Sequence, residues 1–422
     1  MEPNAQALVD GALVDGAQVS AELAAGRRAA FPLGAALTLA DLEGYQSGPQ
    51  VQRALREREP VSWFDRVQGW LVTSRPLVEE VLGDHARFSV HARPSLVRLV
   101  LGDHMLSRDD AGHRHERAPY DPPLRLRPVR ENYTALIEDV AGGLLAPLAR
   151  RTGGELRSAY ANPLAITVAG RALGLAFDDI DRISKIYDFF AEHMVDYTDP
   201  TIGEVTAPAR DELDAIVARN IDRIRRQPDS SVISSIVTTA DPRLRRSDGE
   251  ITGNVRIILF GAIETVTSII LSTTWALLTH PDQLAQAVAD PALFTGAVHE
   301  ALRWISPVGH SERWAACDTE LGGVAIRRGE MVLPSIAAAN RDPGFFPDPD
   351  TFSIHRENAR HHLAFGRGEH HCIGLNLGNL EGQIAVRRLF AEFPRLALDP
   401  RHPAAPSGFG FRSPRPLRVT WT

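Results

Sequence analysis

The chain has 422 residues, 44% of them hydrophobic and 23% charged, which is typical of a globular protein. A formal net charge of −7 argues against a general nucleic-acid-binding surface. The two cysteines, Cys317 and Cys372, lie too far apart in the chain to suggest a disulfide framework and are compatible with a reducing cytoplasm. No uncharged apolar run approaches the roughly twenty residues of a membrane span.

The N-terminal residues contain early acidic side chains and no cationic start, unlike a secretory signal. We therefore expect residues 1–30 to form a flexible leader. One domain is expected over residues 31–422, because no Gly/Ser linker divides the chain. Residues 39–58 have helical periodicity, with a predicted break at Gly48-Pro49.

Two short apolar runs, residues 60–64 and 69–74, are separated by a polar turn and predict a β-hairpin. A short helix is predicted over residues 76–82. Residues 88–107 show no clean periodicity and predict a long loop with a helical turn or two. Loops of this length in compact domains are often functional.

His113 and Arg117 are four residues apart, so on a helix they share one face. Two donors on one face suit a pair of carboxylates. Pro119, Pro122 and Pro123 follow closely and should end the helix early. The alternative for His113 is a solvated surface histidine.

Helical periodicity continues over residues 129–175 and 178–227 with short breaks. Within the second range, an aromatic-rich segment from Tyr187 to Tyr197 ends at the breaker Asp199-Pro200. Such a segment fits either a core stripe or a lid over a pocket, and the sequence leaves both readings open.

A much longer helix is predicted next. Ser247 and Glu250 form a capping-box pattern, and apolar residues then continue to His280-Pro281. The predicted helix exceeds thirty residues, or about 45–50 Å at 1.5 Å per residue. A helix this long and apolar is expected to cross the middle of the fold.

The interior of that helix contains the small pair Gly261-Ala262 followed by Glu264 and Thr265. The Thr265 hydroxyl can bond the carbonyl four residues earlier and widen the helix locally. An acid beside an alcohol can relay protons from solvent to a reacting group. The alternative is that Thr265 only packs and Glu264 pairs with an arginine.

The most distinctive segment is residues 362–378, where Cys372 lies among Gly366, Gly368 and Gly374, just before an apolar helical pattern. These glycines permit tight bends and the close approach of a large group. A helix N-terminus stabilises a thiolate, and a thiolate can ligate haem iron. Two alternatives stay open: an inert buried cysteine, and a zinc site with ligands from His361, His362, His370, His371 and Cys372.

Residues Phe365 to Gly374 resemble the haem-binding signature of the cytochrome P450 family, F-G-x-G-x-H/R-x-C-x-G, at every defined position. Gly261 to Thr265 is similar to the family's A/G-G-x-D/E-T motif. Glu300 and Arg303 match its E-x-x-R motif, with Arg356 at a matching distance downstream. The resemblance implies a mainly α fold with a small β region and a long central helix across haem b.

The resemblance also implies roles for single residues. Cys372 would be the proximal iron ligand, Thr265 and Glu264 would deliver protons, and a buried salt-bridge network would hold the fold behind the haem. The expected network is Glu300, Arg303 and Arg356. Further cofactor contacts are expected from Phe365, Gly366, Gly368, His370, Gly374, His113, Arg117, Arg313 and His362. The expected substrate pocket includes Ala262, Val308, His310, Phe409 and Phe411, with Tyr197 as a further polar candidate.

The implied function is that of a soluble, cytoplasmic haem-thiolate monooxygenase. It would use dioxygen and electrons from NAD(P)H, passed through a ferredoxin or flavodoxin, to oxidise a small to medium organic substrate of bacterial secondary or aromatic metabolism. Arg114, Arg127 and Arg367 are candidates for docking that acidic partner. The alternatives are a peroxide-driven or atypical haem-thiolate enzyme and a non-catalytic haem protein.

Three smaller expectations concern the C-terminal third. Residues 321–326 are strand-like, residues 406–421 suggest a hairpin whose turn enters the pocket, and Cys317 is expected to pack within a strand.

Overall fold

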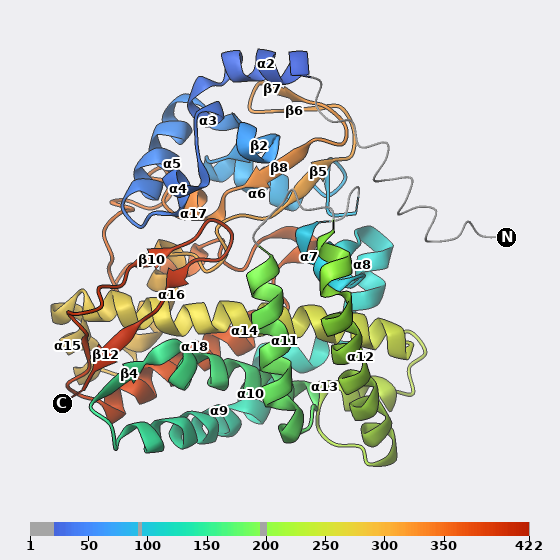
Figure 1. Ribbon diagram of the computed structural model, residues 1–422, viewed down its shortest axis with the longest axis vertical. Coiled ribbons are helices and arrows are strands. Elements are labelled where there is room, and N and C mark those ends of the chain that lie inside the picture. Colours follow the sequence, from blue (N-terminus) through green and yellow to red (C-terminus); the bar gives the residue numbers. More distant parts are fainter. Residues whose placement is uncertain (1–20, 92–94, 195–200, 422) are drawn as a thin grey trace.

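The computed structural model describes residues 21–91, 95–194 and 201–421, and it is mainly helical with small sheets, as expected (Figure 1). The helices are α2 (Ala21–Ala30), α3 (Pro32–Ala35), α4 (Leu39–Glu43), α5 (Ser47–Arg58), α6 (Arg75–Gly83), α7 (Leu96–Leu101), α8 (Asp110–Arg117), α9 (Leu126–Leu148), α10 (Asn162–Leu173), α11 (Ile180–His193), α12 (Ile202–Arg226), α13 (Val232–Val237), α14 (Asp248–Leu278), α15 (Pro281–Ala289), α16 (Leu293–Trp304), α17 (Ile336–Ala339) and α18 (Leu375–Glu392).

The strands are short and form four small sheets. They are β1 (Val61–Phe64), β2 (Gly69–Val72), β3 (Phe88–Ser89), β4 (Gly153–Glu155), β5 (Arg313–Ala315), β6 (Thr319–Leu321), β7 (Val324–Ile326), β8 (Met331–Pro334), β9 (Ala397–Leu398), β10 (Pro406–Ser407), β11 (Ser413–Pro414) and β12 (Arg418–Thr420). The largest sheet has the order β1-β2-β8-β5-β3 and contains the predicted β1/β2 hairpin, with Val61 opposite Val72.

The long helix α14 lies across the middle of the molecule, between the β-rich part above it and helices α9, α10 and α18 below (Figure 1). Its capping box is present: Glu250 N–H donates to the Ser247 hydroxyl at 3.3 Å, and Ser247 N–H donates to the Glu250 carboxylate at 2.8 Å. At 31 residues it is about 46 Å long, as predicted.

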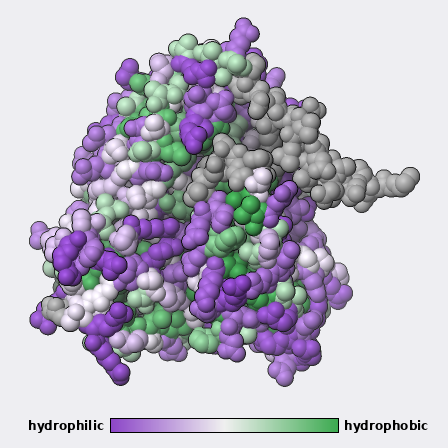
Figure 2. Space-filling view, in the orientation of Figure 1, coloured by the Kyte–Doolittle hydropathy of each residue, from purple (hydrophilic) through white to green (hydrophobic). Residues whose placement is uncertain are grey.

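Helix α14 is also long and apolar enough to cross a membrane, yet 72% of its most apolar window is buried within the fold. It packs against α10, α16 and α18, which is the environment of a core helix. On the face drawn in Figure 2, hydrophilic residues predominate over the helical half, and hydrophobic residues form small separate groups. The apolar side chains of α14 are therefore used inside the protein.

Several expectations for the N-terminal part are corrected. Residues 21–30, expected to belong to the flexible leader, form α2, whose buried Arg27 pairs with Glu330 and lies over the rings of Trp63 and Trp70 at 4.5 and 5.0 Å. The break within residues 39–58 falls at residues 44–46 and not at Gly48-Pro49. Pro49 lies in the first turn of α5, where a backbone N–H would have no partner in the helix, so the proline is tolerated there.

The described residues of the region 88–107 contain the expected helical turns, α7 and the 3₁₀ turn Met105–Ser107, and in addition the short strand β3. Residues 321–326 are no single strand: β6 and β7 are joined by Gly322 and Gly323, whose φ values of +56° and +81° permit a tight turn. Residues 406–421 are likewise divided. β10 and β11 form the hairpin, and β12 pairs with β4 and β9.

Candidate active site

The loop before α18 holds Cys372 in a fixed position. Its N–H donates to the carbonyl of Phe365 at 2.8 Å, and its sulfur accepts N–H groups of Gly374 and Leu375 at the start of α18. Burial raises the pKa of the thiol, and those N–H groups, with Arg117, act in the opposite direction. The sulfur is therefore a protonated thiol by itself, with donors in place to stabilise the thiolate that a metal ion would select.

The predicted glycines explain the shape of this loop. Gly366 and Gly368 have φ values of +71° and +76°, a region that favours glycine. A Cβ on Gly368 would lie 2.5 Å from the carbonyl oxygen of Leu82. The loop can thus pass closely beneath α6 and still present the sulfur to the interior.

The sulfur faces a cavity of about 260 Å³, which we call the thiol cavity. Cys372 and Phe365 line it on one side, and Gly261, Ala262 and Thr265 of α14 line it on the other. A Cβ on Gly261 would meet no atom within 4 Å, so open space lies beside the helix there. A thiol facing an apolar space across a long helix fits the thiolate-ligated macrocycle expected from the sequence.

Three cationic or polar side chains that line the cavities could hold the carboxylates of such a macrocycle. Arg117 and His370 line the thiol cavity, and the buried Arg313 lines a neighbouring cavity. His370 Nε2 bonds Asp109 at 3.0 Å, while its buried Nδ1 has no partner in the described part of the chain. An unpartnered buried nitrogen at this rim is consistent with a missing carboxylate.

Two of the predicted anchors are not brought to the cavity. The ring nitrogens of the buried His113 lie 2.8 Å from the Met105 carbonyl and 3.0 Å from that of Glu369. His113 lies in α8, and Glu369 lies in the cysteine loop, so this contact joins the helix to the loop. His362 is also buried away from both cavities, where its Nδ1 accepts the Ala364 N–H at 3.2 Å.

Each alternative that the sequence left open for the acid–alcohol pair of α14 describes one of its two residues: Thr265 lines a cavity, and Glu264 pairs with arginines. The Thr265 hydroxyl donates to the Gly261 carbonyl at 2.5 Å and faces the thiol cavity, as the functional reading requires. Glu264 is buried and paired with two arginines, Arg157 at 2.9 Å and Arg415. The carboxylate is therefore present but held by ion pairs at the wall of the neighbouring cavity.

The predicted salt-bridge network is present and almost wholly buried. Arg303 donates through two nitrogens to the two oxygens of Glu300, both at 2.7 Å. Arg356 donates to the same carboxylate at 3.0 Å. Arg303 also donates to the backbone carbonyls of Asn340 and Pro349, so its charge is fully hydrogen-bonded.

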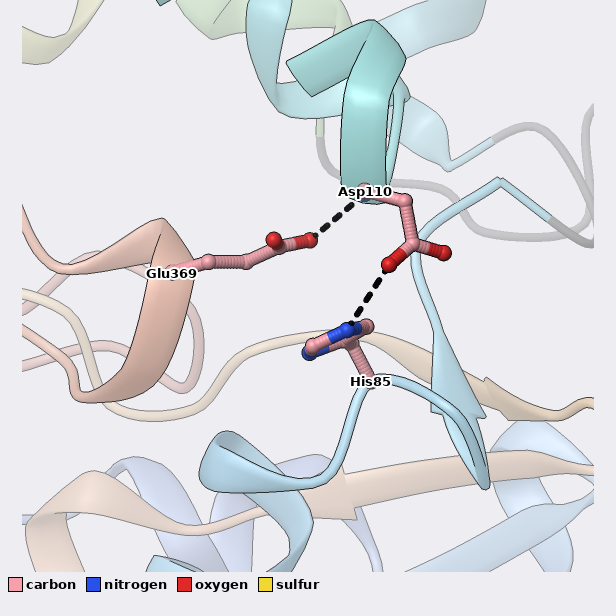
Figure 3. A group of neighbouring side chains, drawn as sticks. All are labelled: His85, Asp110 and Glu369. Atoms are coloured by element: carbon pink, nitrogen blue, oxygen red, sulfur yellow. Dashed lines mark hydrogen bonds and ion pairs between the residues drawn. The ribbon is translucent and has the colours of Figure 1, made fainter. Parts of the chain in front are cut away.

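A second set of contacts ties α8 to the cysteine loop (Figure 3). The Glu369 carboxylate accepts the Asp110 N–H at 2.9 Å, and the Asp110 carboxylate lies 3.0 Å from His85 Nε2. Among the described residues this group and the group of Asp109, Glu369 and His370 have the spacing of metal ligands. Neither contains Cys372, so the structure does not assemble the zinc site considered from the sequence.

A larger cavity of about 470 Å³, here called the outer cavity, adjoins the thiol cavity and shares Gly261, Thr265 and Val308 with it. The predicted pocket residues line these cavities: Ala262, Val308, His310, Phe409 and Phe411. Burial lowers the pKa of His310 to about 4, and its ring lies 4.2 Å from that of Phe409. Tyr197 lies outside the described residues.

Leu96 and Val97 line the outer cavity and come from the region 88–107, which the sequence predicts to be functional. Glu312, which directly precedes the predicted cofactor contact Arg313, also lines the cavity and was not predicted. The described part of the aromatic segment divides between the core and the cavity wall. Tyr187 and Phe190 lie in the core, whereas Met194 lines the outer cavity. Cys317 is exposed in the turn after β5, so the expectation that it packs within a strand is wrong.

Comparison with known proteins extends these observations. Residues 285–415 match the family description Cytochrome P450. The chain is 32% identical over 365 residues to the 20-oxo-5-O-mycaminosyltylactone 23-monooxygenase of Streptomyces fradiae, covering 83% of each protein. It is 36% identical over 339 residues to cytochrome P450 monooxygenase PikC of Streptomyces venezuelae, covering 78% of this chain and 79% of that protein.

The solved structure of the cytochrome P450 PksS of the Bacillus subtilis 168 bacillaene polyketide synthase superposes with a TM-score of 0.80 at 28% identity, over 89% of this chain and 96% of that one. With Cys372 and the Thr265 of a long central helix lining one cavity, and with relatives matched over most of their length, the chain belongs to the cytochrome P450 family and is a monooxygenase.

Proposed function

We propose that this monooxygenase binds haem b through the Cys372 thiolate and oxidises a small to medium organic substrate held in the outer cavity. When bound, the haem would supply the chemistry of dioxygen activation, with the thiolate favouring O–O cleavage. The observation that carries the proposal is that the Cys372 thiol and the Thr265 hydroxyl line one apolar cavity from opposite sides.

Thr265 would hold and transfer protons at the reacting face. Its hydroxyl lies at the boundary of the two cavities and bonds the helix backbone, which leaves its oxygen free to accept from a water or substrate. Glu264 would supply protons from the solvent side. Because two arginines hold its carboxylate, that role requires the side chain to exchange at least one ion pair for a water or hydroxyl partner.

Arg117, Arg313 and His370 would bind the haem carboxylates. The Arg117 Nη1 nitrogen donates to the His371 carbonyl at 2.7 Å, and its Nε donates to Asp121 at 3.1 Å, so Nη2 is the atom best placed to donate to a carboxylate. Phe365, Gly366, Gly368 and Gly374 would shape the contact below the ring. His113 and His362 would act through the backbone positions that they hold.

Electrons would arrive from NAD(P)H through a reductase and a ferredoxin or flavodoxin. Arg114, Arg127 and Arg367 have exposed side chains that suit an acidic partner. Residues 31–422 would form one domain of a cytoplasmic protein with no nucleic-acid or membrane partner. The substrate would come from bacterial secondary or aromatic metabolism. The names of the relatives support secondary metabolism.

A carbon monoxide difference spectrum of the reduced protein tests the proposal. We expect a strongly red-shifted Soret band that Cys372→Ser abolishes. Cys317→Ser is the matched control, because this exposed cysteine lies away from both cavities and should leave the band unchanged. A spectrum without that band, or one that survives Cys372→Ser, would show that the ligand assignment is wrong.

A further inference from the structure

Some of the charged side chains that line the outer cavity form ion pairs, and others do not. There are five such side chains: Glu43, Glu264, Glu312, Arg313 and Arg415. Glu264 is paired with Arg415 and also with Arg157 from outside the lining, so this part of the wall has an excess of positive charge. The remaining two acids, Glu43 and Glu312, have no ion pair among the described residues.

Arg313 does not neutralise its neighbour Glu312 directly. It donates to the backbone carbonyl of Glu312 at 2.8 Å rather than to the carboxylate. Successive side chains along an extended segment point in opposite directions, which separates the two groups. Asp109 and Glu369 also act on the charge of Arg313, which places that guanidinium toward the cysteine-loop side.

Glu312 itself is poorly satisfied. Within the described part of the chain, the carboxylate of Glu312 accepts one hydrogen bond, from the N–H of Leu96, at a long 3.4 Å. Burial raises the pKa of the carboxyl to about 7, although the Leu96 N–H and Arg313 oppose the shift. A half-buried carboxyl with one weak partner has unused hydrogen-bonding capacity, and such groups occur most often where a ligand supplies the missing contact.

The other residues that line the outer cavity are mostly apolar or uncharged. Apolar side chains line the same cavity as the acid, including Val97 of α7, Phe260 of α14 and Met194 just after α11. The histidines that line the cavity are uncharged at neutral pH, since burial lowers the pKa of His104 to about 3 and that of His310 to about 4. The cavity is therefore a largely apolar space lined by two acids, Glu312 and Glu43, that have no ion pair with any residue the structure describes.

We propose that Glu312 is a specificity-determining residue that binds a protonated or quaternary amine on a substrate with a bulky apolar body. The amine would supply the ion pair that Glu312 lacks, and the apolar body would lie toward α14 and the thiol cavity. Glu43 would add a second, more distant negative charge. The inference rests on the proposed function, because it takes the outer cavity to be where the substrate is held.

A pair of matched probes tests it. (4-Phenylbutyl)trimethylammonium carries a permanent cation whose nitrogen has no lone pair to ligate iron, and its carbon isostere carries a tert-butyl group in the same place. At pH 8 we expect the holoenzyme to bind the cation about 10- to 100-fold more tightly than the isostere, measured by equilibrium dialysis.

Glu312→Gln should remove that preference while retaining the affinity for the tert-butyl probe and the carbon monoxide spectrum. Glu43→Gln is the matched control on the same cavity and should retain most of the preference. Equal binding of the two probes to the wild type, no binding of the cation, or an undiminished preference in Glu312→Gln would each overturn the inference.

A second measurement needs no variant. The affinity for the quaternary cation should rise between pH 6 and 8, because the cation favours the ionised carboxyl, and the affinity for the isostere should stay constant. The pKa values of His104 and His310 lie far below this window, and those of Arg313 and Arg415, both about 10, lie above it. Glu43 and Glu264 are the other charged groups that line the cavity.

A flat pH profile for the cation would count against Glu312 as its partner. Failure of the inference is distinguishable from failure of the proposed function. A protein with an intact red-shifted band but no cation preference would refute only the role of Glu312, whereas a missing band would refute the haem-thiolate assignment.

Discussion

The Glu300 network and the wall of the outer cavity differ in how completely their charged groups are paired. Near the cysteine loop, Cys372 is fixed by backbone N–H groups, and Glu300 accepts from two arginines and a backbone donor, although His370 Nδ1 and Glu381 Oε1 lack partners there among the described residues. Around the outer cavity, Glu312 has one weak partner. The contrast indicates that the cysteine side is built to hold one geometry, while the outer side retains unused interactions for a ligand.

The largest expected effect comes from breaking the paired side. Glu300→Gln preserves shape but leaves Arg303 and Arg356 without their counter-charge in a buried site. We expect it to lower the free energy of unfolding by about 3–5 kcal/mol. Urea unfolding and the rate of haem loss would measure this. Glu131→Gln, which removes an exposed pair with Arg127, is the control and should cost less than about 1 kcal/mol.

The next effect concerns the boundary between the two sides. Thr265→Ala should lower product formation by about 10²-fold, because it removes the hydroxyl that we propose transfers protons, while oxygen consumption continues. Product formed per dioxygen consumed is the measurement. Thr267→Ala is the matched control, since Thr267 is buried in the same helix and should not alter this ratio. An unchanged ratio in Thr265→Ala would show that this hydroxyl only packs.

A smaller effect should reveal the unpaired acid of the outer side through stability. The pKa of Glu312 is raised to about 7 in the folded state from 4.5, so the folded protein binds a proton more tightly than the unfolded chain. Stability relative to Glu312→Gln should therefore fall as pH rises from about 4.5 to 7 and level off above. Melting temperatures of both proteins from pH 5 to 8 would measure it, and a constant difference would contradict the assignment.

The smallest expected effect tests whether the position of α14 is maintained by its N-terminal capping box or by the packing of its side chains. Ser247→Ala removes one half of the capping box far from both cavities and should cost about 1 kcal/mol in unfolding free energy. The carbon monoxide spectrum should not change, because α14 is held mainly by burial. A lost spectrum would mean that the helix terminus controls the position of Thr265.

The chain's local patterns predicted the cysteine side well. The spacing of Gly366, Gly368 and Cys372 and the E-x-x-R pair depends on backbone conformation and on helix geometry, which are properties of neighbouring residues. The length of α14 and its capping box were predicted for the same reason. Local patterns failed where a contact came from elsewhere in the chain: α2 is anchored by Arg27 to Glu330, some 300 residues away.

The sequence by itself therefore determined the helical segments, the glycine-rich cysteine loop and the acid–alcohol pair, because each is encoded by residues close together in the chain. Only the tertiary structure decided which side chains share a cavity. It gave His113 backbone carbonyl partners and His362 a backbone N–H, paired Glu264 with Arg157 and Arg415, and left Glu312 without an ion pair among the described residues at the wall of the outer cavity. Those outcomes depend on how distant segments meet, and no local periodicity records that.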